Sequence, residues 1–124
     1  MPDPRRALGQ LGEELAVHYL QQRGYDIVER NYRCPYGEVD VVARDGSRLA
    51  FVEVRARRGT AFGSPEESVT PQKQQRLVTV AREYLQAHDI IDVDWGIDVV
   101  AVEFTSAGVL RRIELLRDVV METS

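Results

Sequence analysis

The chain has 124 residues, of which 44% are apolar, so it can bury one modest core, and its single cysteine excludes an internal disulfide. No apolar run approaches the ~18 residues of a membrane span, the first ten residues lack the apolar region of a secretion signal, and a net charge of −4 argues against strong nonspecific binding of nucleic acid. We therefore expect a single domain over residues 1–124, with its core over about 7–116, that is soluble and cytoplasmic and has no membrane partner.

The predicted elements begin with a helix over residues 7–22. Its apolar residues recur at helical spacing, and Gly24 ends it. Gly9 and Gly12 lie on the packed side, where we expect them to let the helix approach a sheet closely. A strand follows over 25–31, and strands over 38–44 and 48–55 form a hairpin around the turn-forming pair Asp45-Gly46.

A loop is expected over residues 56–69, before a second helix. Thr70 and Pro71 suit the N-cap and first position of that helix, which should run to about residue 88. Strands over 97–104 and 109–116 are the last predicted elements. Because a strand–helix–strand step requires a parallel pair, the order αβββαββ predicts an α/β fold with a mixed sheet of about five strands flanked by helices.

Two acidic residues interrupt apolar strands of the predicted hairpin. Glu53 stands in the run over 49–54, and Asp40 stands in its partner strand. Burying an unpaired carboxylate costs free energy, and proteins usually reduce this cost with a bound cation, a hydrogen-bond network or a raised pKa. A two-residue turn would pair position 40 with 51, and a four-residue loop would pair 40 with 53. Either register places Glu38, Asp40, Glu53 and Arg55 on one sheet face.

This cluster has two interpretations. Opposed carboxylates repel each other, and a divalent cation bound by their oxygens would turn that repulsion into attraction. The alternative is a set of ion pairs that uses Arg55 and Arg57 without a metal. The residues alone leave both open.

Three further charged residues are candidates for the same site. Glu13 lies at the border of the first helix's apolar stripe, where it either reaches the site or stays solvated, whereas its neighbour Glu14 should be solvated. Lys73 shares a helix face with Leu77, so it either contacts phosphate or water in the site or extends into solvent. Asp98 interrupts another apolar strand, and we expect it to pair with an arginine rather than bind a metal.

The distribution of charge is uneven along the chain. Residues 23–82 hold eleven Arg or Lys against eight Asp or Glu, whereas the other segments hold five against twelve. A local basic surface and a dispersed, solvated one both agree with these counts.

Seven short motifs occur in order between about residues 7 and 102. They are G-x-x-G-E (9–13), N-Y-R (31–33), G-E-V-D (37–40), F-V-E-V-R-x-R (51–57), F-G-x-P (62–65), V-T-x-x-K (69–73) and D-V-V (98–100). Together they make the chain resemble the YraN family. That family is regarded as a branch of the PD-(D/E)xK nuclease superfamily, similar to archaeal Holliday-junction resolvases.

The resemblance implies a restriction-endonuclease-like fold and hydrolysis of DNA phosphodiester bonds, including those of branched or structured DNA, with Mg²⁺ or Mn²⁺. By position, Asp40, Glu53 and the Val54 carbonyl would bind the metal, with Glu13 helping directly or through water. Arg55 and Lys73 complete the expected catalytic set, and Arg55, Arg57 and Lys73 would contact nucleic acid. By analogy with the resolvases, we expect a homodimer.

Arg55 departs from the PD-(D/E)xK pattern of the superfamily, because it stands where that motif has lysine. Arginine stabilises negative charge, but its pKa above ~12 makes it a poor proton acceptor. The alternative function is therefore a nucleic-acid-binding module on the same fold that cuts slowly or not at all.

Overall fold

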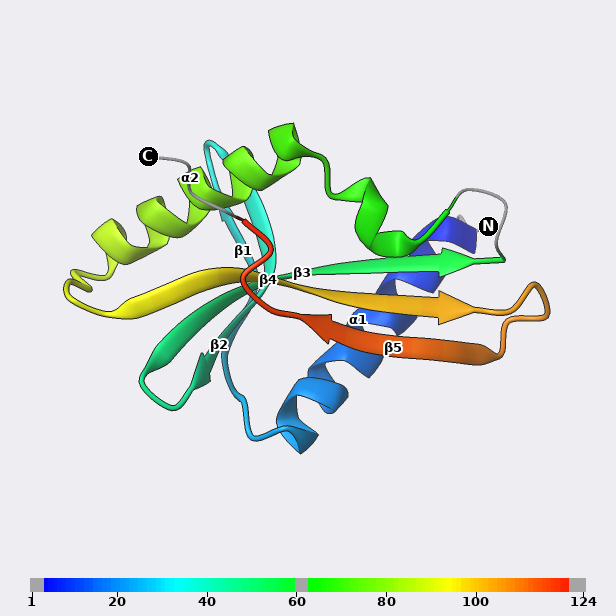
Figure 1. Ribbon diagram of the computed structural model, residues 1–124. Helices are drawn as coiled ribbons and strands as arrows, with labels where there is room; N and C mark the ends of the chain where they lie inside the picture. Colours follow the sequence, from blue (N-terminus) through cyan, green and yellow to red (C-terminus); the bar gives the residue numbers. More distant parts are fainter. Residues whose placement is uncertain (1–3, 60–62, 121–124) are drawn as a thin grey trace.

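The computed structural model describes residues 4–59 and 63–120. Phe62, part of the F-G-x-P motif, lies outside the described residues. The elements follow the predicted order, with one short 3₁₀ turn added. They are α1 (Pro4–Gln22), β1 (Asp26–Cys34), β2 (Gly37–Asp45), β3 (Arg48–Arg58), η1 (Pro65–Ser68), α2 (Pro71–Ala87), β4 (Asp94–Phe104) and β5 (Leu110–Leu116) (Figure 1).

The five strands form one mixed sheet in the order β1-β2-β3-β4-β5. Neighbours are antiparallel except for β3 and β4, which run parallel because α2 carries the chain across the sheet between them. The helices α1 and α2 lie on opposite faces of the sheet (Figure 1). The predicted α/β architecture with a mixed five-stranded sheet is confirmed. No described helix combines the length and the apolar character that crossing a bilayer requires.

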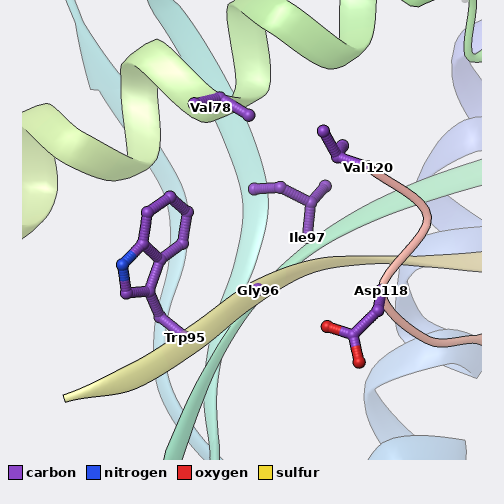
Figure 2. Close-up of a pocket in the computed structure, with 6 residues that line it drawn as sticks. All are labelled: Val78, Trp95, Gly96, Ile97, Asp118 and Val120. Atoms are coloured by element: carbon purple, nitrogen blue, oxygen red, sulfur yellow. The ribbon is translucent and has the colours of Figure 1, made fainter. Parts of the chain in front are cut away.

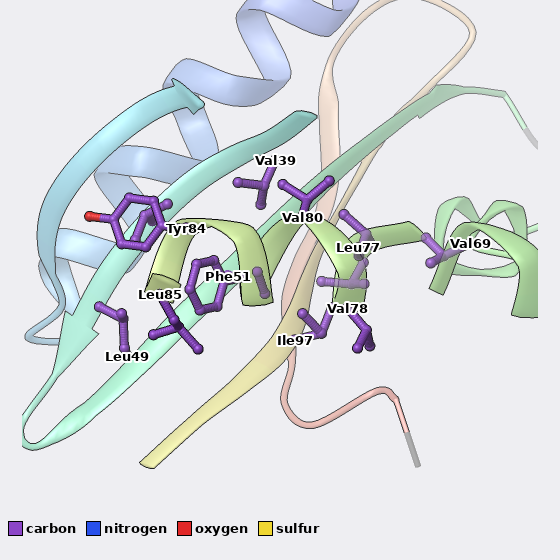
Figure 3. Packing of buried hydrophobic residues seen from close by; sticks show 13 residues of the cluster. Val39, Leu49, Phe51, Val69, Leu77, Val78, Val80, Tyr84, Leu85 and Ile97 are labelled. Carbon is purple, nitrogen blue, oxygen red and sulfur yellow. The ribbon is translucent and has the colours of Figure 1, made fainter. Parts of the chain in front are cut away.

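Apolar side chains of β3 alternate between two cores. On the α2 face, Phe51 packs edge-on against Tyr84, with ring centroids 5.5 Å apart, and Leu77 and Val80 of α2 fill the space beside them (Figure 3). On the α1 face, Val52 belongs to the cluster that includes buried residues of α1. Because β3 is buried on both faces, its central residues form a continuous apolar run.

Gly9 and Gly12 of α1 differ in the space around them. A Cβ on Gly12 would lie 2.8 Å from the Cβ of Ala56, so α1 approaches β3 as closely as expected there. A Cβ on Gly9 would meet nothing within 4 Å. The expectation of a close approach at Gly9 is therefore wrong.

The β2–β3 hairpin adopts the register in which positions 40 and 53 stand opposite each other. Val41 pairs with Val52, and Asp45 pairs with Arg48, so the turn residues are Gly46 and Ser47. A tight turn at Asp45-Gly46 is therefore not formed. Gly46 has φ 61°, a left-handed conformation that glycine adopts without strain.

The connection between β3 and α2 is shorter than predicted. The loop was expected to begin at residue 56, but β3 continues to Arg58 because β4 pairs with it as far as Phe104. The turn η1 then occupies part of the remaining segment. As predicted, Thr70 caps α2: its hydroxyl accepts a hydrogen bond from the Lys73 amide at 3.3 Å.

A buried ion pair joins β3, β4 and the segment after β5. Arg48 donates two hydrogen bonds of 2.8 Å to Asp98, whose side chain is 0% exposed, and a third of 2.7 Å to Asp118. The Val119 amide donates to the Ile97 carbonyl. Val120 then lines a cavity with Val78 and Ile97 (Figure 2). Asp98 thus pairs with an arginine, as predicted.

Candidate functional site

The site begins where β2 and β3 separate. Their register ends at the pair Val41–Val52, and β3 then continues beside β4 without β2. In Figure 1 the β1–β2 hairpin turns upward beside α2, whereas β3 runs on with β4 and β5. At the point of separation the Asp40 Oδ2 atom accepts a hydrogen bond of 2.8 Å from the Val54 amide. The Asp40 carboxylate thus replaces the main-chain acceptor that a continuing β2 would supply.

Glu53 lies opposite Asp40 on the face that α2 covers. Its side chain is 14% exposed, and Arg55 Nη2 donates a hydrogen bond of 3.0 Å to Glu53 Oε2. Burial raises the pKa of Glu53 to about 9, and hydrogen bonding with the nearby Asp40 carboxylate and the charge of Asp40 act in the same direction. The charge of Arg55 lowers this pKa but does not offset the other effects. Without a cation, these effects favour the protonated form of Glu53.

Arg55 brings an unsatisfied donor to the same place. Its Nε atom is buried and has no hydrogen-bond partner, a condition shared among the described residues only by the Tyr25 hydroxyl. A buried donor without a partner costs about 1–3 kcal/mol, so such a group is a good candidate to bind an incoming acceptor. A phosphate oxygen is an acceptor of the required kind.

A cavity of about 230 Å³ opens above Glu53 and Arg55, which we call the carboxylate cavity. Lys73 and Arg76, one turn apart on α2, line it together with Glu38. The side chains of Lys73 and Arg76 make no hydrogen bond or ion pair with any residue in the described ranges. The cavity therefore offers unpaired positive charge beside Glu53, the carboxyl group of the pair that lines it.

The two carboxylates fit a divalent cation of the Mg²⁺ type. Since the Val54 amide faces Asp40, the Val54 carbonyl faces the same side of the strand. Two carboxylates and one carbonyl are hard oxygen donors, and Mg²⁺ commonly takes one or two carboxylates and keeps several waters. A cation between Asp40 and Glu53 would also offset the burial and the like charge that raise the pKa of Glu53. No group of three or more His, Cys, Asp or Glu residues suited to holding a metal occurs within residues 4–59 and 63–120.

Glu13 is directed elsewhere. Its Oε1 atom accepts hydrogen bonds from Asn31 at 3.1 Å and from Arg30 at 3.4 Å, both on β1. Its neighbour Glu14 is exposed, as predicted, and pairs with Arg30 at 2.6 Å. The structure thus brings Asp40, Glu53, Arg55 and Lys73 together and places Glu13 in a network with β1.

Arg57 lines a second cavity, which has a volume of about 500 Å³ and also contacts Arg55 and Lys73. The predicted residues did not include Arg76 or the other arginines at these cavities. Arg76 could have been found from its position three residues after Lys73, since that spacing puts both on one helix face.

The comparisons with known proteins agree with the motifs. The model described as "Uncharacterised protein family UPF0102", the YraN family, matches residues 12–102. A UPF0102 protein of Beutenbergia cavernae is 50% identical over 113 residues, which are 91% of this chain and 95% of that protein. One of Syntrophus aciditrophicus is 44% identical over 110 residues, or 89% and 85% of the two chains. One of Chloroflexus aurantiacus is 48% identical over 103 residues, or 82% and 83%.

Proposed function

The chain belongs to the uncharacterised protein family UPF0102, and on that premise we propose that it is a metal-dependent endonuclease that hydrolyses DNA phosphodiester bonds. The observation that supports the proposal most directly is the pair Asp40–Glu53, two carboxylates held together in a mostly buried site. Burying a carboxylic acid beside a like charge destabilises the metal-free fold, and a bound cation reverses that cost.

In this proposal Asp40, Glu53 and the Val54 carbonyl hold Mg²⁺. When bound, the ion supplies a water of lowered pKa and neutralises negative charge on the phosphate. Asp40 is oriented by the Val54 amide, so its carboxylate stays directed at the metal position. Glu53 would hold the ion as the carboxylate, and Arg55 lies beside it at hydrogen-bond distance.

The basic side chains bind and orient the phosphate. Arg55 offers its partnerless Nε–H to a nonbridging oxygen, and Lys73 and Arg76 add positive charge from α2. Arg55 cannot accept the proton of the attacking water, because its guanidinium stays charged. Its role is therefore restricted to charge stabilisation and positioning.

The test is cleavage of linear duplex, single-stranded and four-way DNA by the purified protein in Mg²⁺ or in EDTA. Asp40→Asn and Glu53→Gln should each abolish Mg²⁺-dependent cutting. Glu38→Gln is the matched control, because Glu38 lines the same cavity but is about half exposed and pairs with Arg33. Cutting that persists unchanged in either site variant would refute the assignment.

The alternative is a module that binds nucleic acid without cutting it. Arginine in the lysine position of the motif favours this alternative, because β3 then carries no basic side chain that can exchange a proton, and only Lys73 of α2 offers one in the cavity. It predicts binding that weakens with salt, needs no metal and is unaffected by Glu53→Gln. Retention of DNA by the protein in EDTA, without cleavage in Mg²⁺ or Mn²⁺, would identify it. The homodimer expected by analogy with resolvases stays a prediction, which gel filtration coupled to light scattering can test.

A further inference from the structure

Beyond the bond from the Val54 amide to Asp40, no strand among the described residues pairs with the edge of β3 that faces away from β4. The Val54 amide faces the side that β2 has left, and by alternation the amides of Ala56 and Arg58 face the same side. The intervening residues face β4, as the bond from the Gly59 amide to the Phe104 carbonyl confirms. Two main-chain donors therefore point away from the sheet next to the proposed nuclease site.

A basic groove runs along this edge. It is the cavity of about 500 Å³ lined by the end of β3 together with residues of α1, η1 and α2. Five basic residues line it, and none of its described lining residues is acidic; they are Arg5, Arg55, Arg57, Arg58 and Lys73. In a chain with a net charge of −4, this local concentration favours a polyanion.

The spacing along β3 suits a nucleic-acid backbone. Residues two apart on a strand are separated by about 6.6 Å and share a face, so Arg55 and Arg57 form a short row. This separation is close to that of neighbouring phosphates along an extended strand. Because Arg55 and Lys73 also line the carboxylate cavity, a strand in the groove leads to Glu53, which lines that cavity.

The groove continues into an apolar recess at its far end. The recess has a volume of about 430 Å³, and Arg5, Leu8 and Arg58 line both it and the groove. Leu11, which is 47% exposed, and Ala7 add apolar surface, and Gly108 of the β4–β5 turn closes it. The first turns of α1 lie beside the end of β3 at this point (Figure 1).

We propose that the basic groove and the apolar recess bind an unpaired DNA strand, with phosphates along the open edge of β3 and a base in the recess. A paired duplex keeps its bases stacked inside the helix, so it has none to place in an apolar recess beside a phosphate site. Arg58, whose Nε donates to the Ser106 carbonyl, lines the recess, and a guanidinium group is a surface on which bases commonly stack. This assignment rests on the proposed nuclease function and names its substrate: DNA with an unpaired strand next to the scissile bond.

The test measures binding separately from cutting. Fluorescence anisotropy in EDTA compares three labelled probes: a blunt duplex, the same duplex with a three-nucleotide 3′ or 5′ tail, and the tailed duplex with abasic sites in the tail. At least one tailed probe should bind roughly tenfold more tightly than the blunt duplex, and the abasic tail, which keeps the phosphates, should lose most of that gain.

Two variants place a negative charge in the recess, Leu11→Asp and Ala7→Asp. Both positions are exposed, so the fold should tolerate the changes, and each should remove the preference for the base-containing tail. Ile91→Asp is the matched control, because Ile91 is 84% exposed and lines neither the groove nor the recess. It makes the same change in net charge and should leave the preference intact.

The outcomes distinguish this inference from the proposed function. Equal binding of intact and abasic tails, an unaltered preference in both recess variants, or no binding of any probe would overturn the inference. Cleavage of blunt and tailed DNA at equal rates would also overturn it while supporting the nuclease. A tail preference that depends on the recess, in a protein that cuts no DNA with Mg²⁺ or Mn²⁺, would support the binding site and refute the nuclease.

Discussion

Replacing Glu53 by glutamine should stabilise the metal-free protein, by an amount that grows with pH. The pKa of Glu53 is raised from 4.5 to about 9, first by burial and then by Asp40. Between these values the folded chain keeps a proton that the unfolded chain releases, so the contribution of Glu53 to stability falls as pH rises. Glutamine resembles the protonated acid in shape and hydrogen bonding and does not ionise.

The size of the effect follows from the distance between the unfolded pKa and the working pH. Each pH unit corresponds to about 1.4 kcal/mol, so Glu53→Gln should add about 3 kcal/mol to the free energy of unfolding at pH 7. At pH 5 the gain should be below about 1 kcal/mol, and near pH 4 it should vanish. A typical domain has a total stability of about 5–15 kcal/mol, so the difference is large enough to measure.

Urea denaturation of both proteins in EDTA, from pH 4 to pH 8.5, measures this difference directly. Titrating groups that do not interact with Glu53 are common to the two proteins and cancel in the comparison. Glu38→Gln should give no comparable trend, because the Glu38 side chain is about half exposed. Saturating Mg²⁺ should stabilise the wild type but not Glu53→Gln. A stability difference that does not change with pH would refute the reasoning about Glu53.

Three further predictions follow from the same contacts. Gly12→Ala should lower the free energy of unfolding by about 1 kcal/mol in urea titrations, because overpacking against Ala56 outweighs the gain in helix propensity. Gly9→Ala should instead raise the free energy of unfolding by up to about 1 kcal/mol, because a Cβ there meets nothing. Equal effects of the two substitutions would contradict the close approach at Gly12. Asp98→Asn should cost about 3 kcal/mol, because it leaves Arg48 charged and mostly buried, and a loss below about 1 kcal/mol would show that the ion pair is dispensable. Arg55→Lys should raise the single-turnover rate of Mg²⁺-dependent cleavage, since lysine can exchange a proton; a lower rate would show that the arginine is the better group at this position.

The elements that depend on local signals were predictable. Thr70 and Pro71 mark the start of α2 because capping is decided within one helical turn. The length of β3 was not predictable in the same way. Its last three residues, Ala56, Arg57 and Arg58, include only one apolar residue, and they are held in the strand by pairing with β4, which comes much later in the sequence. The two possible hairpin registers differ only in turn geometry, which the strand pattern does not specify.

For the candidate site, the sequence was sufficient to predict the two carboxylates but not their hydrogen-bond partners. Asp40 and Glu53 stand out because each interrupts an apolar strand. The bond from Val54 to Asp40 requires β2 to leave the sheet after Val41, a consequence of tertiary packing. The position of Glu13 depends on its hydrogen bonds with Arg30 and Asn31 of β1, which no pattern in the sequence indicated. Asn31 has a left-handed φ of 56°.

The hydrogen bond between Asp40 and Val54 gives relatives of this protein a reason to keep Asp40 that does not apply to Glu53. Asp40 satisfies a main-chain amide whether or not a metal is ever bound, so a relative that has lost its chemistry would still benefit from it. Glu53 offers the metal-free fold no such benefit. We therefore expect a relative without the proposed nuclease activity to keep the aspartate and to have a neutral residue at position 53.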